Sequence, residues 1–431
     1  MTTTSRPPPR RTGMVETPAS VRFVDHAALG ACVHCGLCLA SCPTYLELGE
    51  EADSPRGRIH LMSALEYGRL SPSSEVTRHL DLCLGCRACE TACPSGVRYG
   101  SLIEAARPYV EAHRPLVARW SRRALARVLT SPRVGASIFA SLRLLGGRRW
   151  LGAIARRVPT GPGAWMALAA AMPVRRRVPR LPAELLPEGP ARGTAVLLTG
   201  CSAATLFPST VLAAARLLRR AGLRVVVPPR QRCCGALALH LGDADGARTL
   251  ARHTTAVLDG RPFDWVVSTA AGCGALVREY DHLLVDQPAA SAVAARARDA
   301  LDLLAELGLP PPIHPLGRSV TVHDPCHLAH GQGVRMAARA LLAAVPGVRL
   351  VELEEADVCC GSAGTYNLTQ PRMARRLLAR KLDHIAATGA EVVAAANPGC
   401  LLQIRAGVIA RGLPIEVEHP LDLLAAAHGV T

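Results

Sequence analysis

Half of the sixteen cysteines in this 431-residue chain fall into two copies of one pattern, Cys-x2-Cys-x2-Cys-x3-Cys-Pro. Cysteine thiolates are the usual protein ligands of iron–sulfur clusters, and a [4Fe–4S] cube needs one thiolate for each iron. Three closely spaced cysteines can wrap one corner of such a cube, so the fourth thiolate must come from elsewhere. The two copies are Cys32, Cys35, Cys38 and Cys42 before Pro43, and Cys83, Cys86, Cys89 and Cys93 before Pro94.

In bacterial two-cluster ferredoxins the fourth cysteine of each run ligates the other cluster. The same exchange here predicts two [4Fe–4S] clusters whose ligands interlock the two runs. The alternative is structural zinc, but zinc ribbons normally use two separated Cys-x2-Cys pairs, and these compact runs favour iron–sulfur. The predicted ligand sets are Cys32, Cys35, Cys38 and Cys93 for one cluster, and Cys83, Cys86, Cys89 and Cys42 for the other.

The remaining eight cysteines form a second repeated pattern. Each copy has an adjacent Cys-Cys-Gly, one cysteine 32 or 33 residues upstream of it and one 39 or 40 residues downstream. Spacing that agrees this closely indicates an internal duplication. The two copies are Cys201, Cys233, Cys234 and Cys273, and Cys326, Cys359, Cys360 and Cys400.

Adjacent cysteines can form only a strained disulfide, so joint metal ligation is the favoured interpretation of each Cys-Cys-Gly. These thiols could therefore hold further iron–sulfur centres; the alternative is a pair of ordinary buried thiols in each repeat. Gly235 and Gly361 would allow positive φ or a close backbone approach. Of the polar residues around Cys326, we expect Asp324 and His327 to lie near the site, as donors to cluster sulfur or as a proton relay. The other histidines there, His323 and His330, are expected to be structural.

The elements that must position these cysteines differ between the two parts of the chain. The ferredoxin motifs begin 51 residues apart, wider than in a compact β-type ferredoxin. The segment HLMSALEYGRL between them predicts a helix with an apolar stripe of Leu61, Met62, Leu65 and Leu70. From residue 191 short apolar runs alternate with helical stretches, which predicts parallel sheets built from βαβ units.

The predicted strands are 195–199, 225–227, 265–268, 319–323, 349–353 and 391–395, and the clearest helices are 209–221 and 244–258. Upstream and downstream cysteines follow strands directly, where α/β sheets place their sites. The fold class is α+β multidomain: an α-helical ferredoxin domain followed by a duplicated α/β domain. The expected divisions are a disordered segment 1–20, the ferredoxin domain 21–115, a basic helical connector 116–190, and Cys-Cys-Gly repeats 191–310 and 311–431.

The composition limits the kinds of partner that this chain is expected to bind. The net charge is +16, aromatic residues make up 3% of the chain, and Lys381 is the only lysine. So few aromatic residues argue against base-stacking nucleic-acid modules, and no nucleic-acid partner is expected. Arginine is concentrated in 105–180, which holds one acidic residue, Glu111. Its apolar residues alternate with arginine, so this segment either lies on an anionic membrane surface or packs on the protein with arginine in solvent.

Metal-binding thiolates need a reducing compartment. The pair Arg10-Arg11 is not followed by an apolar stretch, so we do not expect a twin-arginine export signal. The longest apolar segment, 164–174, is well short of the ~20 residues that span a bilayer. We therefore expect a cytoplasmic protein, with peripheral contact at the inner face of the membrane as an option. No Gly-x-Gly-x-x-Gly fingerprint opens a helix after a strand, so neither FAD nor NAD is expected on this chain.

Taken with their order, these motifs resemble the iron–sulfur subunit of glycolate oxidase (glycolate dehydrogenase), within a Cys-Cys-Gly-domain family that includes heterodisulfide reductase subunits. The resemblance covers residues 25–431 and rests on six pieces of sequence: CVHCGLCLASCPTYLELGEEADSPRGRIHLM, CLGCRACETACPSGVRYGSLIEAARP, AAGCGALVREYDHLL, HDPCHLAHGQGV, CCGSAGTYN and NPGC.

The resemblance implies an electron-transfer subunit of an oxidoreductase complex that does not itself bind the organic substrate. Separate FAD-containing subunits would oxidise glycolate to glyoxylate, and this chain would pass the electrons to the membrane quinone or its reductase. There are two alternatives to this function. The chain could be the iron–sulfur subunit of a lactate or anaerobic glycerol-3-phosphate dehydrogenase, or its Cys-Cys-Gly sites could reduce a disulfide. One departure matters: fully loaded heterodisulfide reductase repeats end in Cys-x2-Cys, whereas here Ala270 and Asn397 replace the first of that pair. Four thiolates per repeat put a noncubane double cluster in doubt.

Overall fold

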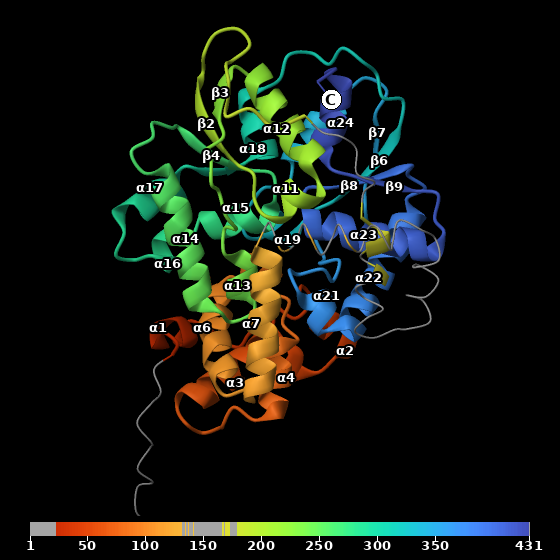
Figure 1. Cartoon of the computed structure of the whole chain (residues 1–431). Coiled ribbons are helices and arrows are strands. Elements are labelled where there is room, and N and C mark those ends of the chain that lie inside the picture. Colours follow the sequence, from red (N-terminus) through yellow and green to blue (C-terminus); the bar gives the residue numbers. More distant parts are fainter. Residues whose placement is uncertain are drawn as a thin grey trace, which may run out of the picture.

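The computed structural model describes residues 23–131 and 179–430, with residues 134, 137, 141, 166–167 and 169–172 between them. The expectation of disorder in residues 1–20, and most of that for the basic connector, lie outside the described residues. In Figure 1 a helical unit occupies one end of the molecule and two α/β units occupy the other.

Within residues 23–131 the regular elements of the N-terminal unit are all helices, in agreement with the mostly α-helical domain that the spacing of its motifs predicts. Its core is formed by residues such as Met62, Leu65, Leu80, Leu102 and Ile103, all of them at most 1% exposed. The helices are α1 (His26–Gly30), α2 (Pro43–Leu48), a 3-10 turn η1 (Glu51–Asp53), α3 (Pro55–Glu66), α4 (Ser74–Asp81), α5 (Ala88–Thr91), α6 (Tyr99–Ala112) and α7 (Leu116–Thr130).

Helix α3 confirms the predicted helix but ends before the predicted stripe does. The chain leaves the helix after Glu66, and Gly68 has a positive φ of 66°. Leu70 therefore lies outside the helix and is 41% exposed, so its place in the apolar stripe is wrong. The left-handed Gly68 explains the stop, because it turns the chain so that the backbone N–H of Arg69 donates to the Ala64 carbonyl at 2.8 Å and caps the helix.

Two sheets follow. Six of their strands agree with the predicted runs to within about two residues, whereas the short strands β1, β5 and β9 were not predicted. The first has the order β1-β3-β2-β4-β5; β1 pairs antiparallel with β3 and the other pairs are parallel. The second has the order β7-β6-β8-β9 and is parallel throughout. The strands are β1 (Glu184–Leu185), β2 (Gly193–Leu198), β3 (Leu223–Val226), β4 (Trp265–Ser268), β5 (Ala297–Asp299), β6 (Ser319–His323), β7 (Arg349–Val351), β8 (Val392–Ala395) and β9 (Glu416–Glu418).

The sheet orders show the duplication directly, since β3-β2-β4-β5 corresponds to β7-β6-β8-β9. The helices of the first repeat are α11 (Ser202–Leu206), α12 (Pro208–Arg220), α13 (Ala236–His240), α14 (Ala244–Leu258), α15 (Ala271–Val277), α16 (Tyr280–Leu283), α17 (Pro288–Ala295) and α18 (Ala300–Leu307). Those of the second are α19 (Cys326–Ala329), α20 (Ala337–Ala343), α21 (Tyr366–Thr369), α22 (Pro371–Ala387), α23 (Pro398–Arg411) and α24 (Pro420–Ala427).

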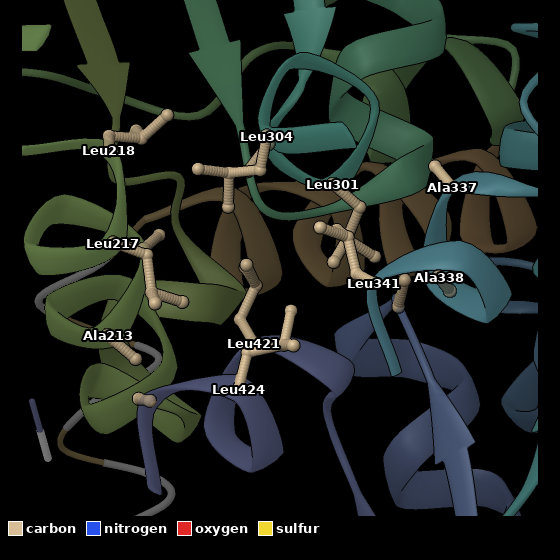
Figure 2. Close-up of a cluster of buried hydrophobic side chains, with 14 of the residues drawn as sticks. Ala213, Leu217, Leu218, Leu301, Leu304, Ala337, Ala338, Leu341, Leu421 and Leu424 are labelled. Carbon is tan, nitrogen blue, oxygen red and sulfur yellow. The ribbon is translucent and has the colours of Figure 1, made fainter. Parts of the chain in front are cut away.

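The two repeats share one hydrophobic core. Helix α12 packs against α24, and α18 packs against α20. These contacts are equivalent, because α12 and α20 follow the first parallel strand of their repeats, while α18 and α24 follow the last. Figure 2 shows Leu217 and Leu421 converging in this core, and both are fully buried. Each such leucine contributes about 1.5–3 kcal/mol relative to an exposed one, so the repeats stabilise one another.

Among the described helices, none combines the length and the apolar character that a bilayer crossing requires.

Candidate metal centres

The two ferredoxin-type runs fold into loops with the same backbone turns. The residues on either side of the second cysteine have positive φ in both runs: His34 (54°) and Gly36 (82°) in the first, Gly85 (66°) and Arg87 (63°) in the second. Left-handed residues on both sides of a cysteine curl the chain, and such turns can direct backbone N–H groups toward a concave site for negative charge. The run spacing therefore produces two similar cradles.

The second cradle brings together the four thiols that the exchanged-ligand hypothesis groups. Cys42, Cys83, Cys86 and Cys89 line one small cavity, although Cys42 belongs to the first run. The backbone N–H of Gly85 lies 3.3 Å from Cys83 Sγ, in the direction that would stabilise a thiolate. All four cysteines are buried. The donor set and its burial fit a cluster held away from solvent.

Arg58 places a positive charge beside this cavity. Its side chain is 1% exposed and lies 3.9 Å from Cys42 Sγ, and it also donates to Thr44 Oγ1 at 3.0 Å and to the His79 carbonyl at 2.7 Å. Burial opposes its ionisation, but nearby Cys83 and other acidic groups raise the pKa of Arg58 overall. A buried, charged arginine suits a cluster whose thiolates and sulfides carry net negative charge. No sequence pattern singles out this arginine, which ends the segment SPRGR.

The other predicted set is more open to solvent. Cys32, Cys38 and Cys93 are half-buried against the core of the helical unit, whereas Cys35 is exposed and lies outside that core. Burial raises the pKa of Cys38, and the charge of Cys32 adds to this effect. A cluster at this position would lie near the surface, where a redox partner could approach it.

Each Cys-Cys-Gly repeat brings its four thiols into contact at the carboxyl ends of its parallel strands. Cys201 Sγ lies 3.4 Å from Cys233 Sγ, and a chain of thiol contacts continues through the adjacent cysteine to the downstream one. The second repeat has the same chain of contacts. In order, the chains are Cys201, Cys233, Cys234 and Cys273, and Cys326, Cys359, Cys360 and Cys400.

The glycine of each motif is required by both conformation and space. Gly235 has φ of 102° and Gly361 has φ of 85°. An added Cβ would lie 3.0 Å from the Ala247 carbonyl oxygen at Gly235, and 2.5 Å from the Ala374 carbonyl oxygen at Gly361. The same helix-to-loop contact thus holds the cysteine pair in both repeats, and it aligns Ala247 with Ala374.

One Cys-Cys-Gly site adjoins the second cradle. Cys86 shares a buried cluster with Cys326 and Cys359. Burial, and then the negative charge of Cys326, raise the pKa of Cys86 well above its usual range. Two sets of thiols that are 240 residues apart in sequence (Cys86 and Cys326) are therefore neighbours.

Polar groups around the second repeat lie differently from the sequence-based expectation. His327 does lie beside the site, with Nδ1 3.7 Å from Cys326 Sγ. Asp324 forms an ion pair with Arg339 at 2.8 Å. The ring that lies among the thiols is that of His323, which has a nitrogen within 4.8 Å of the Sγ atoms of Cys360 and Cys400. No signal in the sequence distinguished His323 from the histidines around it.

The single lysine of the chain also lies at this site. Lys381 is 1% exposed, and its ammonium group donates to the carbonyl oxygens of Glu355 and Ala356. Burial lowers its pKa, while the neighbouring Cys360 and Cys359 oppose that effect. A buried ammonium next to adjacent thiols favours their ionised, metal-binding form.

Comparison with known families agrees with the division of the cysteines into two ferredoxin-type runs and two Cys-Cys-Gly repeats. The family described as 4Fe-4S dicluster domain matches residues 28–97, and the family described as Cysteine-rich domain matches residues 195–278 and 320–405. The first contains all eight cysteines of the paired runs, and the second contains all eight of the repeats. The chain is therefore an iron–sulfur protein by family.

Relatives extend the match over nearly the whole chain. A probable glycolate oxidase iron-sulfur subunit of Bacillus subtilis is 37% identical, with 94% of this chain and 95% of the relative covered. The glycolate oxidase iron-sulfur subunit of Escherichia coli is 35% identical, over 86% of this chain and 88% of the relative. Lactate utilization protein A of an Exiguobacterium species is 30% identical over 53% of this chain and 95% of its own length. The chain belongs to the family of glycolate oxidase iron–sulfur subunits.

Proposed function

We propose that this chain is the electron-transfer subunit of a flavin-dependent glycolate dehydrogenase complex. FAD-containing partner subunits would oxidise glycolate to glyoxylate, and this chain would carry the electrons toward the quinone pool. Iron–sulfur clusters, when bound, supply the one-electron steps of such a relay. The flavin would reside on the partners, and this chain would not bind the organic substrate.

The ligands proposed for the two [4Fe–4S] clusters are the interlocked sets of the paired runs. Each Cys-Cys-Gly repeat would hold one further centre through its four contacting thiols. The domain divisions 21–115, 191–310 and 311–431 then each contain complete binding motifs. The first cluster is held by Cys32, Cys35, Cys38 and Cys93, and the second by Cys83, Cys86, Cys89 and Cys42.

The observation that carries this proposal is the buried cluster that Cys86 and Cys326 share. A cluster in the second cradle and a centre in the second repeat would therefore share a buried boundary. Electrons could then move between the helical unit and the repeats inside one chain. The exposed first cradle provides a separate point of exit or entry.

A second substrate class has specific support. The lactate utilization relative matches about half of this chain, over nearly its own whole length, so that part of the chain resembles a protein that is named for lactate. A 2-hydroxy acid other than glycolate is therefore the alternative substrate of the flavin subunits. It would leave the relay within this chain unchanged.

We further propose that the chain works in the cytoplasm at the inner face of the membrane. Helix α7 carries several arginines, and Leu116, Val117 and Trp120 at its start are largely exposed. An exposed apolar edge beside basic residues is typical of helices that lie on anionic lipid. Within the described residues α7 packs on α13 of the first repeat.

The proposal is tested by Cys86→Ala in the purified complex, with Ser74→Ala at an exposed position of α4 as the matched control. We expect Cys86→Ala to lose one [4Fe–4S] signal in EPR of the dithionite-reduced protein and to abolish dye reduction. Glycolate binding to the flavin subunit should persist, and the control should behave as wild type. Full dye reduction by Cys86→Ala, or zinc in place of iron in the wild-type chain, would refute the relay.

A further inference from the structure

The two Cys-Cys-Gly sites have the same thiols but different neighbours. Leu198 ends β2 and His323 ends β6, each three residues before the upstream cysteine of its repeat. Lys381 lies seven residues after Ala374, and Thr254 lies seven residues after the equivalent Ala247. The pair Leu198 and Thr254 in the first repeat thus corresponds to His323 and Lys381 in the second.

The first repeat has no nitrogen donor at this position. Leu198 and Thr254 line a small cavity together with Cys234 and Cys273. An aliphatic side chain and a hydroxyl leave the thiols as the strong ligands there. A centre in the first repeat would therefore have thiolate ligation alone.

His323 lacks the hydrogen bonds that a buried histidine with a structural role normally makes. Its side chain is 1% exposed, and neither ring nitrogen makes a hydrogen bond of ordinary geometry. A buried polar group without a partner costs about 1–3 kcal/mol. A structural role would require a partner for at least one ring nitrogen, whereas a metal ligand must keep one nitrogen free.

The geometry points to a ligand: we propose that His323 coordinates the metal centre of the second repeat, adding one imidazole nitrogen to the thiolates of Cys326, Cys359, Cys360 and Cys400. A nitrogen of His323 and the Sγ atoms of Cys360 and Cys400 lie within 4.8 Å of one another, so one metal ion or cluster edge can meet all three. Imidazole binds iron and zinc readily. The inference rests on the metal-binding role proposed above for the repeats.

The contacts of Asn397 are consistent with a fifth ligand at the metal site of the second repeat. Asn397, which occupies the position of the cysteine missing from this repeat, donates from Nδ2 to Cys400 Sγ at 3.5 Å. Asn397 thus supports a thiolate without being a strong ligand itself, and His323 approaches the same sulfur. The two repeats would accordingly hold inequivalent centres, one ligated by thiolates and one by thiolates and imidazole.

The two sites also differ in nearby charge, which has a functional consequence. The imidazole of His323 would be added to the four thiolates and would not replace one, so both centres would keep the same ligand charge. Lys381, beside the thiols of the second repeat, contributes a positive charge that favours the reduced form of that centre. The second repeat would therefore hold the more readily reduced of the two centres, and it is the one that adjoins Cys86.

The test compares His323→Leu, which installs the residue of the first repeat, with His428→Leu as the matched control. His428 is also buried and also has a ring nitrogen without a hydrogen bond, but it is not in the cluster of His323, Cys360 and Cys400. The whole chain is purified anaerobically with ¹⁴N- or ¹⁵N-labelled histidine. Metal content is measured, and pulsed EPR detects nitrogen coupled to each reduced centre. The Cys360→Ala variant identifies the signal and the metal that belong to the second repeat.

We expect nitrogen coupling on the second-repeat signal of wild type and of His428→Leu, and its loss in His323→Leu. The second-repeat metal of His323→Leu should also pass to a chelator about tenfold faster or more. If His323→Leu keeps the nitrogen coupling and the metal retention of the wild type, the assignment of His323 as a ligand is overturned, while the metal-binding role of the repeat still stands. Wild type holding no more metal than Cys360→Ala would instead overturn the metal-binding role of the repeat.

Discussion

The guanidinium of Arg58 lies 3.9 Å from the sulfur of Cys42, inside the helical unit and away from solvent. Cys42 is the one cysteine of the second cradle that comes from the first run. Arg58 also forms an ion pair with buried Asp53. Arg58 therefore places a buried positive charge beside the cysteine that the first run contributes to the second cradle.

Replacing Arg58 with methionine should lower the reduction potential of the second ferredoxin-type cluster. Removing a nearby buried cation makes added negative charge less favourable, and about 1.4 kcal/mol corresponds to about 60 mV for a one-electron couple. An EPR-monitored redox titration measures the change. Arg58→Lys keeps the charge and should restore most of the potential. An unaltered potential in a fully loaded Arg58→Met protein would contradict the electrostatic role.

Gly361→Ala should destabilise the second repeat much more than Gly389→Ala. Both glycines have positive φ, but only at Gly361 would the new Cβ meet a backbone oxygen, at 2.5 Å. Gly389 has open space around it, so its substitution should cost only the backbone strain, about 1 kcal/mol. We expect Gly361→Ala to cost several times that amount and to lower the metal content. Thermal unfolding and metal analysis measure both; equal losses at the two positions would exclude the steric explanation.

The predicted parts of the fold share a physical cause. Strands such as 265–268 and 319–323 agree with the structure residue for residue, because buried parallel strands read as short apolar runs bounded by polar residues. Leu70 was misplaced because the left-handed turn at Gly68 ends the helix. That turn leaves no trace in helical periodicity.

Asp299 should make stability fall as the pH rises. This residue ends β5 and caps the N-terminus of α18. It is 2% exposed, and one carboxylate oxygen accepts a hydrogen bond from the Leu301 N–H while the other has no partner. Burial raises its pKa from 3.8 to about 7. Because the folded-state pKa exceeds the unfolded one, the stability that the protonated group provides is complete below about pH 4 and disappears as the pH passes 7.

The loss between pH 5 and pH 8 should be about 3 kcal/mol. Asp299→Asn has no acidic proton to lose, so its stability should not show this fall. Unfolding midpoints of the two proteins across this range make the comparison. Parallel pH profiles would place the titration elsewhere.

Helix α7 gives a test of the membrane contact. Trp120 is 66% exposed beside the arginines of this helix, so Trp120→Ser should weaken binding to vesicles of anionic lipid by about tenfold. Neutral vesicles and high salt should both reduce binding of the wild-type protein. Co-sedimentation measures it, and Leu186→Ser, at another exposed apolar residue outside α7, is the control. Equal binding by the Trp120→Ser and wild-type proteins would favour packing on a protein partner instead.

The sites were less predictable than the strands. Cysteine spacing alone grouped the thiols of each repeat, because the duplication fixes which residues correspond. Arg58, His323 and Lys381 were not predicted, since a polar residue becomes significant only when the fold buries it next to a thiol. Sequence shows that the chain has a single lysine; only packing shows that this lysine lies at the second repeat.

The equivalent contacts of α12 with α24 and of α18 with α20 make the two repeats resemble the halves of a symmetric dimer joined in one polypeptide. In a true homodimer every substitution appears twice, so both sites change together. Covalent fusion removes that restriction, and one half can alter its site while the other keeps the original. Leu198 with Thr254 in one half and His323 with Lys381 in the other are the result of that independence: a single gene product with two related but separately adjustable sites.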